Sequence, residues 1–147
     1  KAGLSRRRTV ILCTIKKVYR MKDYPYFTSD ELRCGCGKCD GGSMSDAFMS
    51  KLVAIREYLN FPLPISSAFR CEEHNRNVGG ASSSLHLPDK NGNAHAVDIR
   101  IDRDRAYKVV EIARQFGMRG VGVSQKGSAR FVHLDDRNQA DMSFWSY

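Results

Sequence analysis

The sequence predicts an α+β domain in which a small, mainly antiparallel sheet packs against helices. Three patterns support this fold class. Two stretches carry apolar residues at helical spacing, short runs alternate apolar with polar residues, and glycine or proline separates these segments. The 147 residues suffice for one modest core, and no internal repeat is visible. We therefore expect one domain at positions 26–147, preceded by a basic N-terminal arm at positions 1–25.

The first long helix is expected to begin after Ser45 and to end near Asn60. Serine is a favourable N-cap, and two prolines that follow prevent the helix from continuing. Apolar residues recur at spacings of four, three and four, which indicates one buried stripe: Phe48, Leu52, Ile55 and Leu59. Positions 63–69 then predict a short strand, and positions 72–78 a polar helix or turn.

The second half of the chain begins with a Gly/Ser/Asn/Pro-rich loop at positions 79–93, long enough to suggest a functional loop. Positions 96–101 alternate apolar and polar residues, which indicates a half-buried strand. A second helix is expected at positions 102–116, capped by its first residue. Its core side is predicted to consist of Ala106, Val109, Val110, Ala113 and Phe116. Positions 120–123 and 130–134 predict the two strands of a hairpin.

The formal net charge is +8, from 24 Lys and Arg against 16 Asp and Glu, and much of the surplus lies near the N-terminus. Such a surplus favours nucleic acid, an anionic membrane surface or acidic cell-wall polymers. No nucleic-acid-binding signature is present, so we do not expect a nucleic-acid partner. No apolar run is long enough to predict a membrane span. The short apolar stretch at positions 10–13 does not resemble a complete secretion signal, so the sequence leaves the compartment open.

Five cysteines are present, and four of them are candidates for a common site. Cys34, Cys36 and Cys39 lie within six residues of a glycine-rich loop, whereas Cys71 is distant in sequence. Four soft ligands would meet the requirement of a structural zinc site. Partly buried thiols, or one disulfide to Cys71, are the more common alternatives. The sequence leaves all three open.

Two histidines and one aspartate form a candidate metal site. His86 lies in the irregular loop, whereas Asp98 and His133 each stand between two apolar residues of a predicted strand. Side chains alternate between the two faces of a strand, so both polar groups should project away from the core and need a partner. Two imidazoles and a carboxylate, with an open fourth position, suit catalytic zinc. Ordinary buried or surface histidines are the alternative interpretation.

Five motifs, in this order, resemble those of the zinc D-alanyl-D-alanine carboxypeptidase family: SAFRCEEHN at 67–75, VGGA at 78–81, SLH at 84–86, AVDI at 96–99 and FVHLD at 131–135. Positions 26–32 and the cysteine cluster are similar to the small, phage-type branch of this family. The resemblance covers roughly positions 26–137. It implies the fold that these peptidases share with the amino-terminal domain of hedgehog proteins.

Carried over to this sequence, the resemblance implies one catalytic zinc ion with three ligands: His86, Asp98 and His133. It places Arg70 in contact with the substrate, where a planar guanidinium suits a carboxylate. Ser84 corresponds to a residue that supports the site by hydrogen bonding. His74 and His95 match no ligand position.

The general base is where the sequence departs most from the family pattern. Many relatives carry an acidic residue three positions before the last ligand, and Arg130 stands there in this chain. Asp135 is the nearest alternative and lies on the same strand face as His133. Asp135 either acts as the base, or orients His133 and pairs with Arg137. A further departure is an insertion at positions 88–92, between the first two ligands.

The resemblance implies hydrolysis of peptide bonds in peptidoglycan stem peptides. The activity would be that of a D-Ala-D-Ala carboxypeptidase or of an L-Ala-D-Glu type endopeptidase, including a phage endolysin. The alternative is a non-catalytic, zinc-containing module of the same fold that binds the cell wall or a protein. We expect a monomer, and such a function would place it in the periplasm or the cell wall.

Overall fold

The structure is a computed structural model that describes residues 20–147, so most of the expected basic arm lies outside the described residues. The helices and strands follow one another as α1 (Ser29–Leu32), α2 (Asp46–Leu59), β1 (Ile65–Ser67), α3 (Glu72–Asn77), β2 (Ala96–Ile99), α4 (Arg103–Ala113), β3 (Gly120–Ser124), β4 (Phe131–Asp135) and β5 (Ser143–Ser146). Within residues 20–147, no helix is long and apolar enough to cross a membrane.

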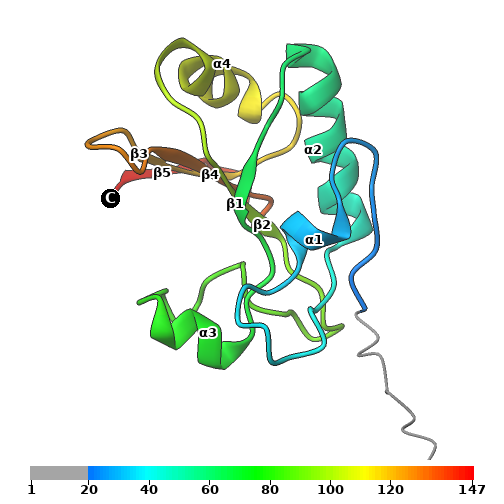
Figure 1. Ribbon diagram of the computed structural model, residues 1–147. Coiled ribbons are helices and arrows are strands. Elements are labelled where there is room, and N and C mark those ends of the chain that lie inside the picture. Colours follow the sequence, from blue (N-terminus) through cyan, green and yellow to red (C-terminus); the bar gives the residue numbers. More distant parts are fainter. Residues whose placement is uncertain (1–19) are drawn as a thin grey trace, which may run out of the picture.

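The five strands form one sheet in the order β1-β2-β4-β3-β5. The first three pairings in this order are antiparallel, and β5 is parallel to β3. In Figure 1, α4 and α3 lie on opposite sides of the sheet. The predicted α+β class with a mainly antiparallel sheet is therefore confirmed, and β5 adds a parallel edge that was not predicted.

Helix α2 has the bounds that the sequence predicted. The Ser45 hydroxyl accepts a hydrogen bond from the Phe48 amide, and Asn60 ends the helix in the left-handed conformation. The predicted stripe lies in the core except at its last residue, Leu59, which is only partly buried. Met49 is buried as well, so the buried side of the helix is wider than predicted.

Helix α1 was not predicted, although its N-terminal signal is present in the sequence. The Thr28 hydroxyl accepts a hydrogen bond from the Glu31 amide, and the Glu31 carboxylate accepts one from the Thr28 amide. This reciprocal pair is a capping box, which the Thr-x-x-Glu spacing indicates. The strand expected at positions 63–69 is shorter than predicted, because Phe69 donates its amide proton to the Leu32 carbonyl instead of to a neighbouring strand.

Two predictions for the second half of the chain are wrong in detail. Strand β2 was expected to be half-buried, but all four of its residues are buried. Its two faces are therefore both covered by other parts of the protein. Helix α4 ends at Ala113, and the turn that follows leaves Phe116 only partly buried. Ile112 takes the core position that was assigned to Val110.

We predict that Gly42→Ala destabilises the fold more than Gly127→Ala does. Both glycines have positive φ, so alanine costs about 1–2 kcal/mol at either position. A Cβ atom at Gly42 would also overlap the ring of Phe69, whereas one at Gly127 meets nothing within 4 Å. The overlap should add about 1–3 kcal/mol to the loss of unfolding free energy, measured by urea denaturation. Equal losses in the two variants would show that Phe69 moves aside freely.

Candidate metal centre

Three buried side chains from separate segments meet at one point. His86 comes from the loop after α3, Asp98 from β2 and His133 from β4. Asp98 Oδ1 lies 2.9 Å from His133 Nδ1 and 3.2 Å from His86 Nε2, and these two nitrogens are 3.2 Å apart. Asp98 and His133 face each other across β2 and β4, so their side chains project from the same face of the sheet.

The spacing of these three atoms fits a tetrahedral metal ion. Nitrogen and oxygen ligands at about 2.0–2.2 Å from zinc lie about 3.3 Å apart when they occupy corners of a tetrahedron. Two imidazoles and one carboxylate leave the fourth corner for water or substrate, as in catalytic zinc sites. The donor set therefore fits zinc, and the role of the three residues as ligands stays a prediction.

Both imidazoles are held in the tautomer that metal binding requires. His86 Nδ1 contacts the Ala68 carbonyl oxygen, which can only accept, so this nitrogen carries the proton and Nε2 presents its lone pair. His133 Nε2 lies 2.8 Å from Asp135 Oδ2, so the neutral form of this ring keeps its proton on Nε2 and leaves Nδ1 free to bind a metal ion. His86 Nε2 and His133 Nδ1 both face the Asp98 carboxylate.

The charges of the centre are set by burial and by mutual contact. Burial alone would raise the pKa of Asp98, but the imidazoles of His133 and His86 outweigh it and hold that pKa well below its usual range. Burial lowers the pKa of His86, which favours the neutral ring. Burial also acts to lower the pKa of His133, but Asp135 and Asp98 outweigh it and raise that pKa. A metal ion at this point competes with the proton on His133.

Asp135 is fully buried behind His133, at the ring nitrogen that points away from Asp98. Arg137 donates to both carboxylate oxygens, from Nε at 2.9 Å and from Nη2 at 2.7 Å. Burial raises the pKa of Asp135, but Arg137 and His133 outweigh it and hold the pKa well below its usual range. A carboxylate held in this way is a weak base. These contacts support the interpretation that Asp135 orients His133.

Two glycines of β3 make room for this arrangement. A Cβ atom at Gly120 would overlap the Asp135 carboxylate, and one at Gly122 would overlap the ring of Trp145. The sequence predicted a strand here but not this requirement, because the neighbours of the two glycines come from β4 and β5.

Arg70 makes a contact that the sequence did not predict. Its Nη2 donates to Asp98 Oδ2 at 2.8 Å, and its Nε donates to Ser67 Oγ at 2.9 Å. The guanidinium therefore holds the oxygen of Asp98 that does not face the imidazoles. Arg70 also lines the cavity, so its predicted contact with substrate remains a proposal. Ser84 lines the same cavity, and its hydroxyl accepts a hydrogen bond from the His86 amide at 3.2 Å.

A cavity of about 660 Å³ lies over the three candidate ligands. The segment 78–85 forms part of its wall, and other lining residues begin β4, follow β4, or lie in and after β5: Phe131, Arg137, Gln139, Trp145 and Tyr147. The Trp145 ring lies 5.2 Å from the His133 ring, between centroids, and the Arg137 guanidinium lies 5.0 Å from the Trp145 centroid. Trp145 and Tyr147 were not predicted to belong to the site, although alternate aromatic residues at positions 145 and 147 indicate one face of a strand.

The other residues singled out in the sequence lie elsewhere. His95 lies between Asp136, at 3.0 Å from its Nδ1, and Asp89, at 2.8 Å from its Nε2. Asp89 belongs to the inserted turn and also accepts hydrogen bonds from the backbone amides of Asn91, within the turn, and Asn93, directly after it. Arg130 Nε donates to the Gly127 carbonyl, and Arg130 is not among the residues that line the cavity. Neither His74 nor His95 joins a potential metal-ligand group in residues 20–147.

Comparison with known proteins gives one family match. The family model described as Peptidase M15 matches residues 25–135, which is well over half of the chain. This range contains all three candidate ligands, together with Arg70, Ser84 and Asp135. No curated protein matches the chain significantly.

We predict that Asp135→Asn chiefly weakens zinc binding, because the amide is a poorer acceptor for the His133 N–H. Loss of such a partner typically costs about 10- to 100-fold in metal affinity. The substitution also removes a charge that raises the pKa of His133, so the fall in zinc affinity on acidification should begin at a lower pH. Zinc titrations over a pH series measure both effects.

The matched control is Asp104→Asn, which changes an exposed carboxylate on α4. It should leave zinc affinity and turnover unchanged. At saturating zinc, Asp135→Asn should regain most of its maximal rate. A persistent loss of about 10²- to 10⁴-fold at saturating zinc would instead identify Asp135 as the general base.

Proposed function

Since the chain belongs to the peptidase M15 family, we propose that it is a zinc peptidase that cleaves the stem peptides of bacterial peptidoglycan. The observation that carries the proposal is the convergence of His86, Asp98 and His133 at the floor of a cavity of about 660 Å³. We propose further that residues 26–147 form the peptidase domain, and that it acts as a monomer in the periplasm or the cell wall.

The three ligands would hold zinc with one coordination position open to the cavity. A metal ion in such a site lowers the pKa of water to about 7 and polarises a carbonyl group. The protein contributes orientation: Ala68 and Asp135 fix the two imidazoles, and Arg70 fixes the Asp98 carboxylate. Preset ligands lower the cost of reorganisation when the metal and the substrate bind.

The cavity suits a short peptide with a free carboxylate. Its volume lies within the range of about 300–1,000 Å³ that small-molecule sites occupy. Arg70 and Arg137 bring positive charge to its wall, and Trp145 and Tyr147 bring apolar surface. Peptidoglycan stem peptides combine free carboxylates with small alanyl side chains. The guanidinium of Arg70 has five N–H groups, and its contacts with three neighbouring side chains leave two of them for such a carboxylate.

One observation favours the alternative of a non-catalytic zinc module. Among the described residues that line the cavity, the only acidic side chains are Asp98 and Asp135, and both are already engaged. Tyr147 also lines the cavity, and burial raises the pKa of its phenol, which therefore stays protonated at neutral pH. An enzyme of this kind would draw its base from Asp135 or from the substrate.

We predict that His86→Ala and His133→Ala each remove one zinc ion per chain and abolish hydrolysis. Each substitution deletes one of three protein ligands, and the remaining two bind the ion far more weakly. Zinc content is measured by mass spectrometry on protein dialysed against metal-free buffer. His95→Ala is the control, because His95 contacts only Asp89 and Asp136 through its ring nitrogens. Full zinc retention in both ligand variants would refute the assignment.

We predict that purified peptidoglycan, digested with the zinc-loaded protein, yields new products in muropeptide mass spectra. Loss of a single alanine residue from the stem identifies a carboxypeptidase, and release of longer peptides identifies an endopeptidase. Addition of a chelator should stop the reaction, and zinc should restore it. Unchanged muropeptides, with full zinc occupancy, would favour the non-catalytic module.

We predict that Arg70→Lys lowers turnover while the protein still binds zinc. Lysine keeps a positive charge near Asp98 but cannot contact Ser67, Asp98 and a substrate carboxylate with one planar fork. Steady-state kinetics and zinc analysis on the same preparation separate the two effects. Arg76→Lys, on the exposed part of α3, is the control. Unchanged kinetics would exclude Arg70 from substrate binding.

A further inference from the structure

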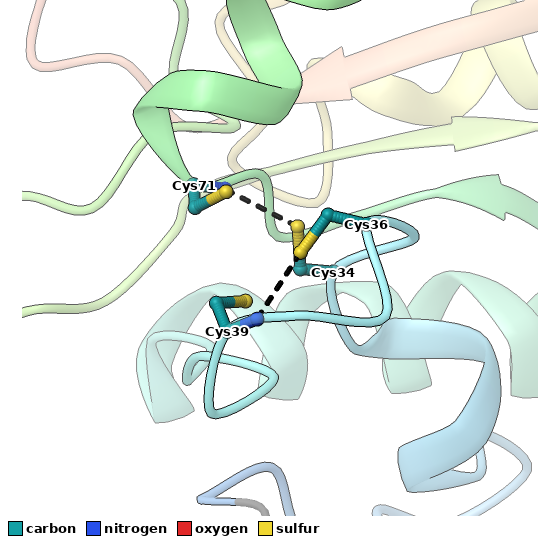
Figure 2. A group of neighbouring side chains, drawn as sticks. All are labelled: Cys34, Cys36, Cys39 and Cys71. Carbon is teal, nitrogen blue, oxygen red and sulfur yellow. Dashed lines mark hydrogen bonds between the residues drawn. The ribbon is translucent and has the colours of Figure 1, made fainter.

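Four cysteine side chains form a second cluster, made of residues other than those of the candidate metal centre. Cys34, Cys36 and Cys39 belong to the glycine-rich loop after α1, and Cys71 lies directly before α3. Their sulfur atoms all lie within 4.8 Å of one another, and all four are free thiols. Figure 2 shows the four sulfurs turned toward a common centre from two segments of the chain.

The arrangement has the dimensions of a tetrahedral metal site. Zinc binds thiolates at about 2.3 Å, so the sulfurs of a tetrahedral site lie about 3.8 Å apart. Even if every pair were separated by the full 4.8 Å, each sulfur would need to move inward by only about 0.6 Å. Disulfides would join the sulfurs in pairs, whereas here all four surround one point.

The backbone around the cluster is arranged to stabilise negative sulfur atoms. Each of the four sulfurs accepts at least one backbone N–H at 3.3–3.4 Å: Cys34 from Cys71, Cys36 from Lys38 and Cys39, Cys39 from Gly41, and Cys71 from His74. Two of these contacts are drawn in Figure 2. Thiolates are stronger acceptors than thiols, and four adjacent thiolates require a cation between them.

We propose that Cys34, Cys36, Cys39 and Cys71 bind a second zinc ion. Four thiolates in tetrahedral positions favour zinc over magnesium or calcium, which prefer oxygen ligands. Four protein ligands leave no position for water or substrate, so the ion is structural and does not take part in hydrolysis. The proposal does not depend on the peptidase activity, because no residue is shared between the two sites.

The ion ties the glycine-rich loop to the segment that carries Arg70. Positions 34–43 contain no helix or strand, and Cys34 and Cys71 are separated by 37 residues in the chain. Arg70 precedes Cys71, contacts Asp98 through its side chain and donates its amide proton to the His86 carbonyl at 2.8 Å. A metal cross-link at Cys71 therefore restrains the backbone from which Arg70 reaches the other centre.

The test separates the two sites by their ligands. The full chain carrying His86→Ala and His133→Ala should retain one zinc ion per chain after dialysis. X-ray absorption at the zinc edge should then show about four sulfur neighbours at about 2.3 Å and no nitrogen shell at 2.0–2.1 Å. The complementary variant, with Cys36→Ser and Cys39→Ser, should lose the sulfur shell but keep one ion with nitrogen and oxygen ligands.

Cobalt replacement in the unmodified chain gives a second measurement that does not depend on how the variants fold. Thiolate-to-cobalt charge-transfer bands should appear in the near ultraviolet, because imidazole and carboxylate ligands do not produce them. Cys13→Ser, which changes the cysteine outside the described residues, should leave the bands and the zinc content unchanged. Disulfide-bonded peptides from this cluster, or a cobalt spectrum without thiolate bands, would overturn the proposal. Loss of peptidase activity alone would not.

Discussion

The pairing of β2 with β4 is the constraint on which the candidate metal centre depends. On one face of this pair, Val97 lies opposite Leu134, and all four strand neighbours of Asp98 and His133 are buried in the core. On the other face, Asp98 lies opposite His133. A slip of one residue would turn the side chains of the two candidate ligands toward the core and the apolar ones toward the cavity. Burial of the apolar face therefore sets the register, and the register brings the two polar side chains together.

Two ion pairs, each between a buried carboxylate and a partly exposed guanidinium, then hold the centre in place. Arg70 binds Asp98 and Arg137 binds Asp135, and each carboxylate also contacts an imidazole. Removal of either arginine leaves a buried carboxylate with fewer partners, which costs at most about 3–5 kcal/mol, the loss measured for fully buried pairs. These charged side chains therefore stabilise one another, and loss of any one of them destabilises the others. This explains why Arg70, which the sequence places only near the substrate, also contributes to the position of a ligand.

The parts of this structure that local patterns specify were predicted well. The Ser45 cap and the apolar stripe of α2 can be predicted from neighbouring residues alone. The same is true of the hairpin formed by β3 and β4. The convergence of the candidate ligands was expected mainly from the order of the family motifs. What could not be predicted depends on contacts between distant segments. Strand β5 pairs in parallel with β3, and the need for glycine at position 120 arises only because Asp135 occupies the space beside it.

The segment from Ser67 to His86 connects the two clusters. Arg70 and Cys71 lie near its start, and His86 lies at its end. The glycine- and serine-rich wall of the cavity lies between Cys71 and His86. Residues 78–85 of this wall contain no helix or strand, and turn hydrogen bonds such as Gly79 N–H to Arg76 and Ser84 N–H to Ala81 hold their shape. With a metal ion bound near each end, the segment is anchored to the glycine-rich loop and to the sheet at once. Its conformational entropy is then lowered before a peptide binds, which is the usual origin of preorganisation in a binding site.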